Sequence, residues 1–181
     1  SWKLRRCGSP LMITEVELFQ PIHPSYNNWT KIQNGNYTID GNFVKVVAKI
    51  ANLSGETKTT PIEFRELKEN VLLPEGKTPI SIEPNEEREI VYMWDTSGYA
   101  WKESGDLNQP EINRQIEVKI TDDAKTENVE VRPKPVIIIP GLWTDKYSFS
   151  EFMKYFENQK SAHWKVDYAR VVTSKSAAEN A

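Results

Sequence analysis

Phe43-Val-Lys-Val-Val-Ala-Lys-Ile50 is the stretch that decides the fold of this chain. Apolar and mostly β-branched residues fill it, which is typical of a β-strand packed on a core. The turn residues Asp40-Gly41 precede it, and a polar loop from Asn52 to Thr57 follows it. The stretch is therefore predicted to be a strand with a definite beginning and end.

A similar pattern extends over residues 11–131, where short apolar segments alternate with turn residues at fairly regular intervals. This spacing predicts an all-β sandwich. About seven strands are expected, the number that an immunoglobulin-like sandwich needs. The expected strand segments are residues 13–21, 43–50, 61–67, 71–73, 80–82, 90–94, 112–120 and 129–131, and the expected turns include Asn34-Gly35, Pro74-Glu-Gly76 and Asp122-Asp123.

Two segments give residues 12–131 a resemblance to bacterial adhesion-related immunoglobulin-like modules. Residues 43–55 are similar to the strand and Asn-x-Gly-type loop of those modules. Residues 82–94 are similar to their proline-and-charge turn, which precedes a strand ending in Trp. The resemblance implies a module that positions or binds and rarely catalyses. It also favours an extracytoplasmic, secreted or envelope-associated location.

The composition argues against several kinds of function. The chain has 181 residues, of which 38% are hydrophobic and 27% charged, and a net charge of -3 at pH 7. This charge gives no electrostatic reason to expect nucleic acid as a partner, and the apolar runs are too short to span a bilayer. Cys7 is the only cysteine and lies in an expected tail of residues 1–10, so neither an intrachain disulfide nor a multi-cysteine metal site is expected. Turn chemistry explains Asp122-Asp123, and no metal or other cofactor is predicted.

The last third begins with Pro135-Val-Ile-Ile-Ile-Pro-Gly-Leu-Trp143. Its run of β-branched residues predicts a strand buried on both faces, as in a parallel sheet. A capping box at Ser148-Phe-Ser-Glu151 predicts a helix, and residues 164–172 predict a second strand. A second capping box, Ser176-Ala-Ala-Glu179, begins a further helix. The order predicts a βαβ unit over residues 136–181 that breaks off within its next helix.

Arg132-Pro-Lys-Pro135 lies between the two regions. Its two prolines predict a short, stiff linker without a place in a ladder of strands. A parallel strand needs partners on both sides. The strand at residues 136–139 has too few partners in this sequence, so we expect it to dock on the sandwich, pack poorly or pair with another molecule.

Residues 136–143 resemble the strand and oxyanion loop of lipase- and esterase-like α/β-hydrolases, in which a hydrophobic strand ends in His-Gly-x or Pro-Gly-x. The resemblance implies that Gly141 permits the tight turn and that the N–H of Leu142 donates to the developing oxyanion. It also implies that Trp143 lines the acyl pocket.

The resemblance stops before the catalytic residues of that family. The chain contains no Gly-x-Ser-x-Gly, and the family order is Ser, then Asp or Glu, then His. His23 and His163 both precede the position where the nucleophile belongs, so neither fits the general base. We therefore expect no catalytic residue in this chain and no hydrolysis by it. If the reading frame continues past Ala181, the full protein is predicted to be a serine hydrolase acting on an ester or lipid.

The rival interpretation is a non-enzymatic binding or adhesion module. Aromatic side chains on a sandwich stack on sugar rings, and Tyr99 and Trp101 lie in an expected long loop, where binding residues are common. Tyr92 and Trp94 lie two residues apart on an expected strand, so they are predicted to fill the core instead. Under this interpretation Tyr99 and Trp101 bind a carbohydrate or another surface ligand.

Overall fold

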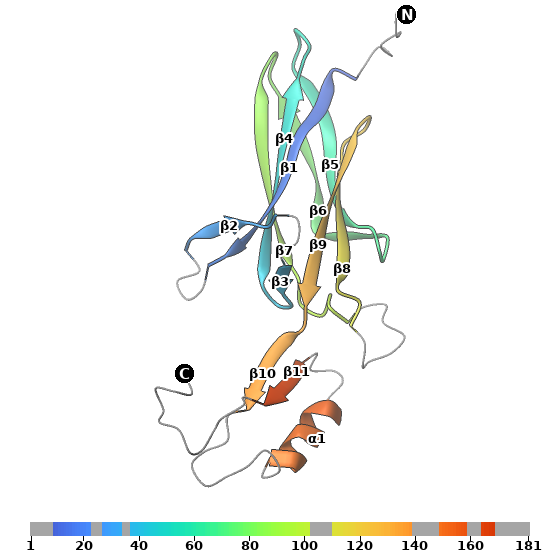
Figure 1. Cartoon of the computed structure of the whole chain (residues 1–181). Coiled ribbons are helices and arrows are strands. Elements are labelled where there is room, and N and C mark those ends of the chain that lie inside the picture. Colours follow the sequence, from blue (N-terminus) through green and yellow to red (C-terminus); the bar gives the residue numbers. More distant parts are fainter. Residues whose placement is uncertain are drawn as a thin grey trace, which may run out of the picture.

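The computed structural model describes residues 9–22, 27–33, 37–101, 110–138, 149–158 and 164–168. Within these residues the chain is mainly β, with one short helix (Figure 1). The elements are β1 (Leu11–Pro21), β2 (Trp29–Lys31), β3 (Tyr37–Ile39), β4 (Phe43–Asn52), β5 (Lys58–Glu66), β6 (Val71–Ile82), β7 (Glu87–Asp95), β8 (Asn113–Lys119), β9 (Ala124–Arg132), β10 (Lys134–Ile138), α1 (Ser150–Asn158) and β11 (Trp164–Tyr168).

Two sheets form the predicted sandwich. One has the strand order β2-β1-β4-β7, and the other has the order β3-β9-β8-β5-β6. The long strands β1 and β4 to β9 supply the seven strands of an immunoglobulin-like sandwich, and all their pairings are antiparallel. The short strand β3 joins the second sheet parallel to β9. The sandwich is therefore immunoglobulin-like, with β6 paired to β5 rather than to β7.

The core lies between the two sheets and follows the alternation of each strand. In β4, the strand predicted over residues 43–50, the residues at every second position from Val44 to Ile50 are fully buried. Phe64 on the opposite sheet stacks on Tyr92 of β7, with ring centroids 4.8 Å apart. The same core includes Ile13, Val16, Leu18, Ile62, Leu73, Ile82, Trp94, Ile116, Val118, Val129 and Val131.

One predicted turn is wrong. Pro74-Glu-Gly76 does not separate two strands but interrupts the continuous strand β6 as a bulge. Glu63 of β5 pairs with Lys77, whereas Arg65 pairs with Leu72, so β6 carries extra residues between these positions. Glu75 within them has a φ of 55°. Proline and glycine mark bulges as well as turns, and local sequence does not distinguish the two.

The bulge makes Gly76 sensitive to substitution. A Cβ at residue 76 would lie 2.7 Å from the carbonyl oxygen of Leu73 and 2.9 Å from that of Phe64. Gly76→Ala is therefore expected to lower the free energy of unfolding by about 1–3 kcal/mol, because main-chain atoms must shift. Urea unfolding measures this, with Gly55→Ala as the control. Gly55 has no atom within 4 Å of its ideal Cβ position. Equal stability of both variants would contradict the bulge geometry.

The predicted strand, helix, strand order is present after the sandwich. β10 pairs in parallel with β11, and α1 lies between them in the sequence. The predicted linker is largely strand, because β9 extends to Arg132 and β10 begins at Lys134, which leaves Pro133 between them (Figure 1). Pro135 pairs in register with Lys165, so the expectation that it has no place in a ladder is wrong. An edge strand accepts proline where the missing N–H faces away from the partner.

Candidate functional site

The residues predicted under the two interpretations, as an oxyanion loop and as a sugar-stacking pair, are placed differently. Gly141, Leu142 and Trp143 lie outside the described residues. Tyr99 is only 6% exposed, and its ring meets Trp94 edge-on at a centroid distance of 5.1 Å. Trp101 is half-buried and packs against the core. The ring of Tyr99 is therefore part of the core and does not present a face for a sugar.

A buried carboxylate explains why Tyr99 turns inward. Asp40 accepts hydrogen bonds from the main-chain N–H groups of Gly98 at 2.8 Å and Ala100 at 3.0 Å. These bonds fold residues 96–101 onto the sandwich. The prediction that Trp94 fills the core is confirmed, and its neighbour Tyr92 is partly buried and donates to the carbonyl of Pro74 at 2.6 Å.

The outer face of the sheet β2-β1-β4-β7 carries exposed apolar side chains that the sequence analysis did not single out. Phe43, Val91 and Met93 are 51%, 49% and 42% exposed. Lys45 pairs in register with Phe19 on one side and Met93 on the other, so the three lie side by side across the strands. The ammonium of Lys45 also lies 4.3 Å from the ring centroid of Trp29. We call this set the aromatic patch: Phe19, Trp29, Phe43, Lys45, Val91 and Met93.

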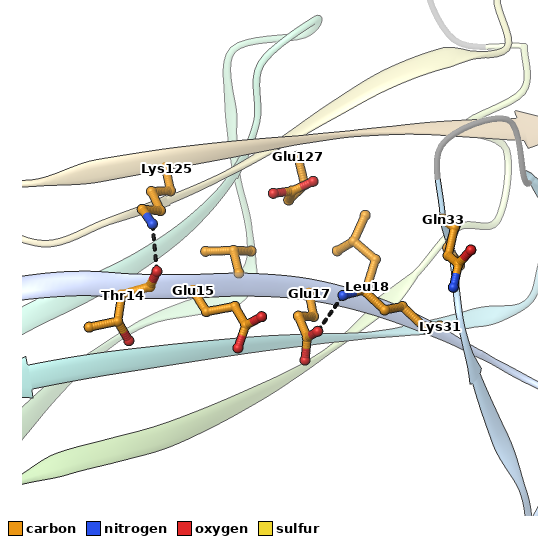
Figure 2. A pocket seen from close by; sticks show the side chains of 10 residues that line it. Thr14, Glu15, Glu17, Leu18, Lys31, Gln33, Lys125 and Glu127 are labelled. Atoms are coloured by element: carbon orange, nitrogen blue, oxygen red, sulfur yellow. Dashed lines mark hydrogen bonds and ion pairs between the residues drawn. The ribbon is translucent and has the colours of Figure 1, made fainter.

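A polar depression of about 430 Å³ lies beside the patch, where the edges of the two sheets meet (Figure 2). Side chains of β9 and of the turn before it bind the main chain of β1 here. Lys125 donates to the carbonyl of Thr14 at 2.6 Å, and Asp123 accepts from the N–H of Ile13 at 2.7 Å. We call this hollow the seam depression; its lining residues are Thr14, Glu15, Val16, Glu17, Leu18, Lys31, Ile32, Gln33, Lys125 and Glu127.

Ion pairs organise most of the charge in the seam depression. Glu17 pairs with Lys31, and Glu15 pairs with Lys49 at 2.7 Å. The hydrogen bond and charge of Lys49 lower the pKa of Glu15, and the hydrogen bond to Glu17 raises the pKa of Lys31. Burial raises the pKa of Glu127, although the nearby lysines oppose this shift. Within the described residues the side chain of Glu127 makes no hydrogen bond or ion pair, and Lys31 and Lys125 act on it through their charges alone.

This arrangement suits binding of a polar ligand. The buried side chains of Val16, Leu18 and Ile32 supply apolar lining, while the carboxylates, lysines and the amide of Gln33 supply acceptors and donors. A signal for Glu127 was available in the sequence, because it lies two residues before Val129 and thus on the core side of its strand.

No group of three or more His, Cys, Asp or Glu side chains able to hold a metal ion occurs within the described part of the chain. No helix among the described residues is long and apolar enough to cross a membrane.

Comparison with known proteins yields only distant likenesses of fold. No protein-family model matches the chain, and no curated protein matches it. A CARDB domain from Pyrococcus furiosus, solved in complex with di-metal ions, has 14% sequence identity and a TM-score of 0.43 over 67% of this chain and 91% of that one.

Glycoside hydrolases of family 2 also resemble the chain. One from Bacteroides cellulosilyticus has 13% identity and a TM-score of 0.48 over 88% of this chain and 26% of that one. A β-galacturonidase from Eisenbergiella tayi, bound to galacturonate, has 10% identity and a TM-score of 0.43 over 89% and 33%. The chain thus spans a third or less of the length of these two enzymes. Likenesses this remote assign neither ligand nor activity, and the immunoglobulin-like sandwich is read from the strand pairing itself.

Proposed function

We propose that the sandwich is a non-catalytic module that binds a carbohydrate chain on its aromatic patch. The single observation that carries this is the exposure of Phe43, Val91 and Met93 on one sheet face, next to the rings of Phe19 and Trp29. Contiguous exposed apolar side chains on a soluble domain mark interaction surfaces. Rings on such a surface stack on the C–H faces of sugars, and tryptophan also provides a polar N–H.

The rim of the patch supports the same ligand class. The pairs Glu17–Lys31 and Glu15–Lys49 lie on the same outer face, next to the patch on β1, β2 and β4. Glu17 is two residues and Glu15 four residues from Phe19 along β1. Paired carboxylates and ammonium groups offer acceptors and donors in a fixed arrangement, as sugar hydroxyls require. Stacking residues beside a polar rim are therefore a suitable design for binding a chain of pyranose rings.

The proposal predicts that the patch, and no other exposed apolar surface, determines affinity. Met93→Ser and Phe43→Ala are each expected to weaken binding to a soluble β-glucan or xylan by at least about ten-fold, equivalent to about 1.4 kcal/mol. Affinity electrophoresis and titration calorimetry measure this. Leu72→Ser is the matched control, because Leu72 on β6 of the other sheet is 42% exposed, as is Met93. Equal affinity of all three variants, or no saturable binding across a panel of polysaccharides, would reject the proposal.

A second candidate function rests on the strand, helix, strand segment. β10 and β11 pair in parallel with α1 between them in the chain, which is the order expected at the front of an α/β-hydrolase domain. In this role the sandwich is an accessory module, and Gly141 and Leu142 stay proposed as the oxyanion loop. Sequencing past the codon for Ala181 and treating the full product with a fluorophosphonate probe test the idea. A downstream frame without Gly-x-Ser-x-Gly, or a product that the probe does not label, would exclude it.

Two further expectations stay predictions. One is the extracytoplasmic location. The other is pairing of residues 136–139 with a second molecule, which the 65% exposure of Ile137 on β10 supports. Light scattering at several protein concentrations tests the pairing.

A further inference from the structure

Glu127 faces the seam depression from the inner side of β9. Val129 and Val131, two and four residues further along, are buried in the core, so the alternation of the strand places Glu127 on the same side. At Glu127 the sandwich is open, because β1 and β9 belong to different sheets and meet only at their edges. Figure 2 shows Glu127 and Lys125 next to each other on β9, on the side that faces the strand carrying Glu17.

The other charged groups around the depression already have direct partners. Glu17 forms an ion pair with Lys31, and Glu15 forms one with Lys49. Lys125 donates a hydrogen bond to the carbonyl of Thr14. With Lys49, which pairs with Glu15, three ammonium groups (Lys31, Lys49 and Lys125) balance the three carboxylates of the lining, Glu15, Glu17 and Glu127. Among the described residues Glu127 is the carboxylate of this set that has no side-chain hydrogen bond or ion pair, because the nearby ammonium group of Lys125 is bound to a main-chain carbonyl instead.

The depression is continuous with the aromatic patch. Phe19 of the patch pairs in register with Lys31, which lines the depression. A chain of sugar rings lying on the patch would thus extend over Lys31 toward Glu127. The volume of about 430 Å³ lies in the range of about 300–1,000 Å³ that small-molecule sites occupy. One sugar unit and its substituents fit such a space.

We propose that the seam depression receives the ammonium group of an amino sugar, with Glu127 as the carboxylate that binds it. The inference rests on the proposed carbohydrate-binding function and names its ligand class. A charge-assisted bond between an ammonium and a carboxylate is stronger than a neutral hydrogen bond. The cation would also balance the charge of a carboxylate that the fold partly removes from water.

Binding of an ammonium should depend on pH in a defined direction. Burial raises the pKa of Glu127; Lys31 of β2 and Lys125 of β9 face it and oppose the shift, and Glu17 of β1 adds to it. The cation binds the ionised form, so affinity is expected to fall as the pH is lowered through the pKa of Glu127. A raised carboxyl pKa also means that ionisation costs the free protein stability as the pH rises through this range. Glu127→Gln should thus unfold at pH 7 at the same or a higher temperature than the parent chain.

The test compares two oligosaccharides that differ in N-acetylation and therefore in charge. Titration calorimetry at about pH 6, where an amine is cationic, measures binding of glucosamine hexamer and of neutral N-acetylglucosamine hexamer. The parent chain is expected to prefer the glucosamine hexamer by at least ten-fold, and Glu127→Gln is expected to lose that preference but still bind the neutral hexamer. Glu117→Gln, on the outer face of β8, removes the same charge and should keep the preference.

The outcomes separate the inference from the function on which it rests. If the parent chain binds both hexamers equally, or Glu127→Gln keeps the preference, the ammonium site is wrong while carbohydrate binding stands. If neither these hexamers nor the neutral polysaccharides bind, both proposals fail. The unfolding temperature of Glu127→Gln shows whether the variant is folded, so that a loss of binding through misfolding is recognised.

Discussion

Arg114→Leu is expected to lower the free energy of unfolding by about 3–5 kcal/mol, because it breaks a buried ion pair from one side. Arg114 on β8 is 1% exposed, and its Nη1 lies 3.8 Å from the carboxylate of Glu66, which is completely buried. Its Nε donates to the carbonyl of Tyr99 at 2.8 Å. The leucine variant would leave the charge of Glu66 in the core without its cation and would remove one of the hydrogen bonds that hold the 96–101 segment.

Urea denaturation with a tryptophan signal measures the loss. Arg132→Leu is the control, since Arg132 and Glu130 form a pair with solvent-exposed side chains, for which at most about 1 kcal/mol is expected. The double variant Glu66→Leu with Arg114→Leu removes both charges and should be less destabilised than the sum of the single variants. A loss for Arg114→Leu as small as that for Arg132→Leu would show that the buried pair does not form.

The second large effect is expected at Asn52, whose side chain is 1% exposed and fully hydrogen-bonded. Its amide nitrogen lies 2.8 Å from the carbonyl oxygen of Glu56 and 2.9 Å from that of Ile82. Its amide oxygen accepts from the N–H of Ser54 at 3.0 Å and from the hydroxyl at 2.7 Å. Asn52→Leu leaves several polar groups without hydrogen-bond partners at once, and each such group costs about 1–3 kcal/mol. The free energy of unfolding is therefore expected to fall by about 3 kcal/mol or more.

The same denaturation experiment tests Asn52→Leu against Asn28→Leu. Asn28 is exposed, so its substitution should change stability by no more than about 0.5 kcal/mol. An Asn52→Leu variant as stable as Asn28→Leu would mean that the loop carbonyls find other donors. Both asparagines belong to glycosylation acceptor patterns, Asn28-Trp-Thr30 and Asn52-Leu-Ser54. Of these two asparagines, Asn28 is the exposed one and the side chain that a modifying enzyme could reach in the folded chain.

The sequence predicted the sandwich because its decisive signals are local. The alternation of Val44, Val46, Ala48 and Ile50 fixes which face of β4 enters the core, and turn residues bound the strand. The inward position of Trp94 follows from the same rule.

The candidate site was not predictable in the same way. Tyr99 turns inward because Asp40, far away in the sequence, binds the main chain around it. The seam depression exists because β1 and β9 meet through bonds such as Lys125 to Thr14, which join residues 111 positions apart. The aromatic patch needs the register of four strands, which no single segment specifies. Long-range pairing thus decides the positions of binding residues that local patterns leave open.

Pro133 is the only residue between the end of β9 and the start of β10. Its ring fixes φ near -65°, so the torsion ψ is the main backbone rotation left at this junction. A ligand bound to the sandwich would stay at a nearly constant distance from β10. Its orientation relative to β10 would change mainly by rotation about this one torsion. Lengthening the junction with Gly-Ser residues would widen the range of separations and reduce the effective concentration of a tethered substrate without altering either binding surface.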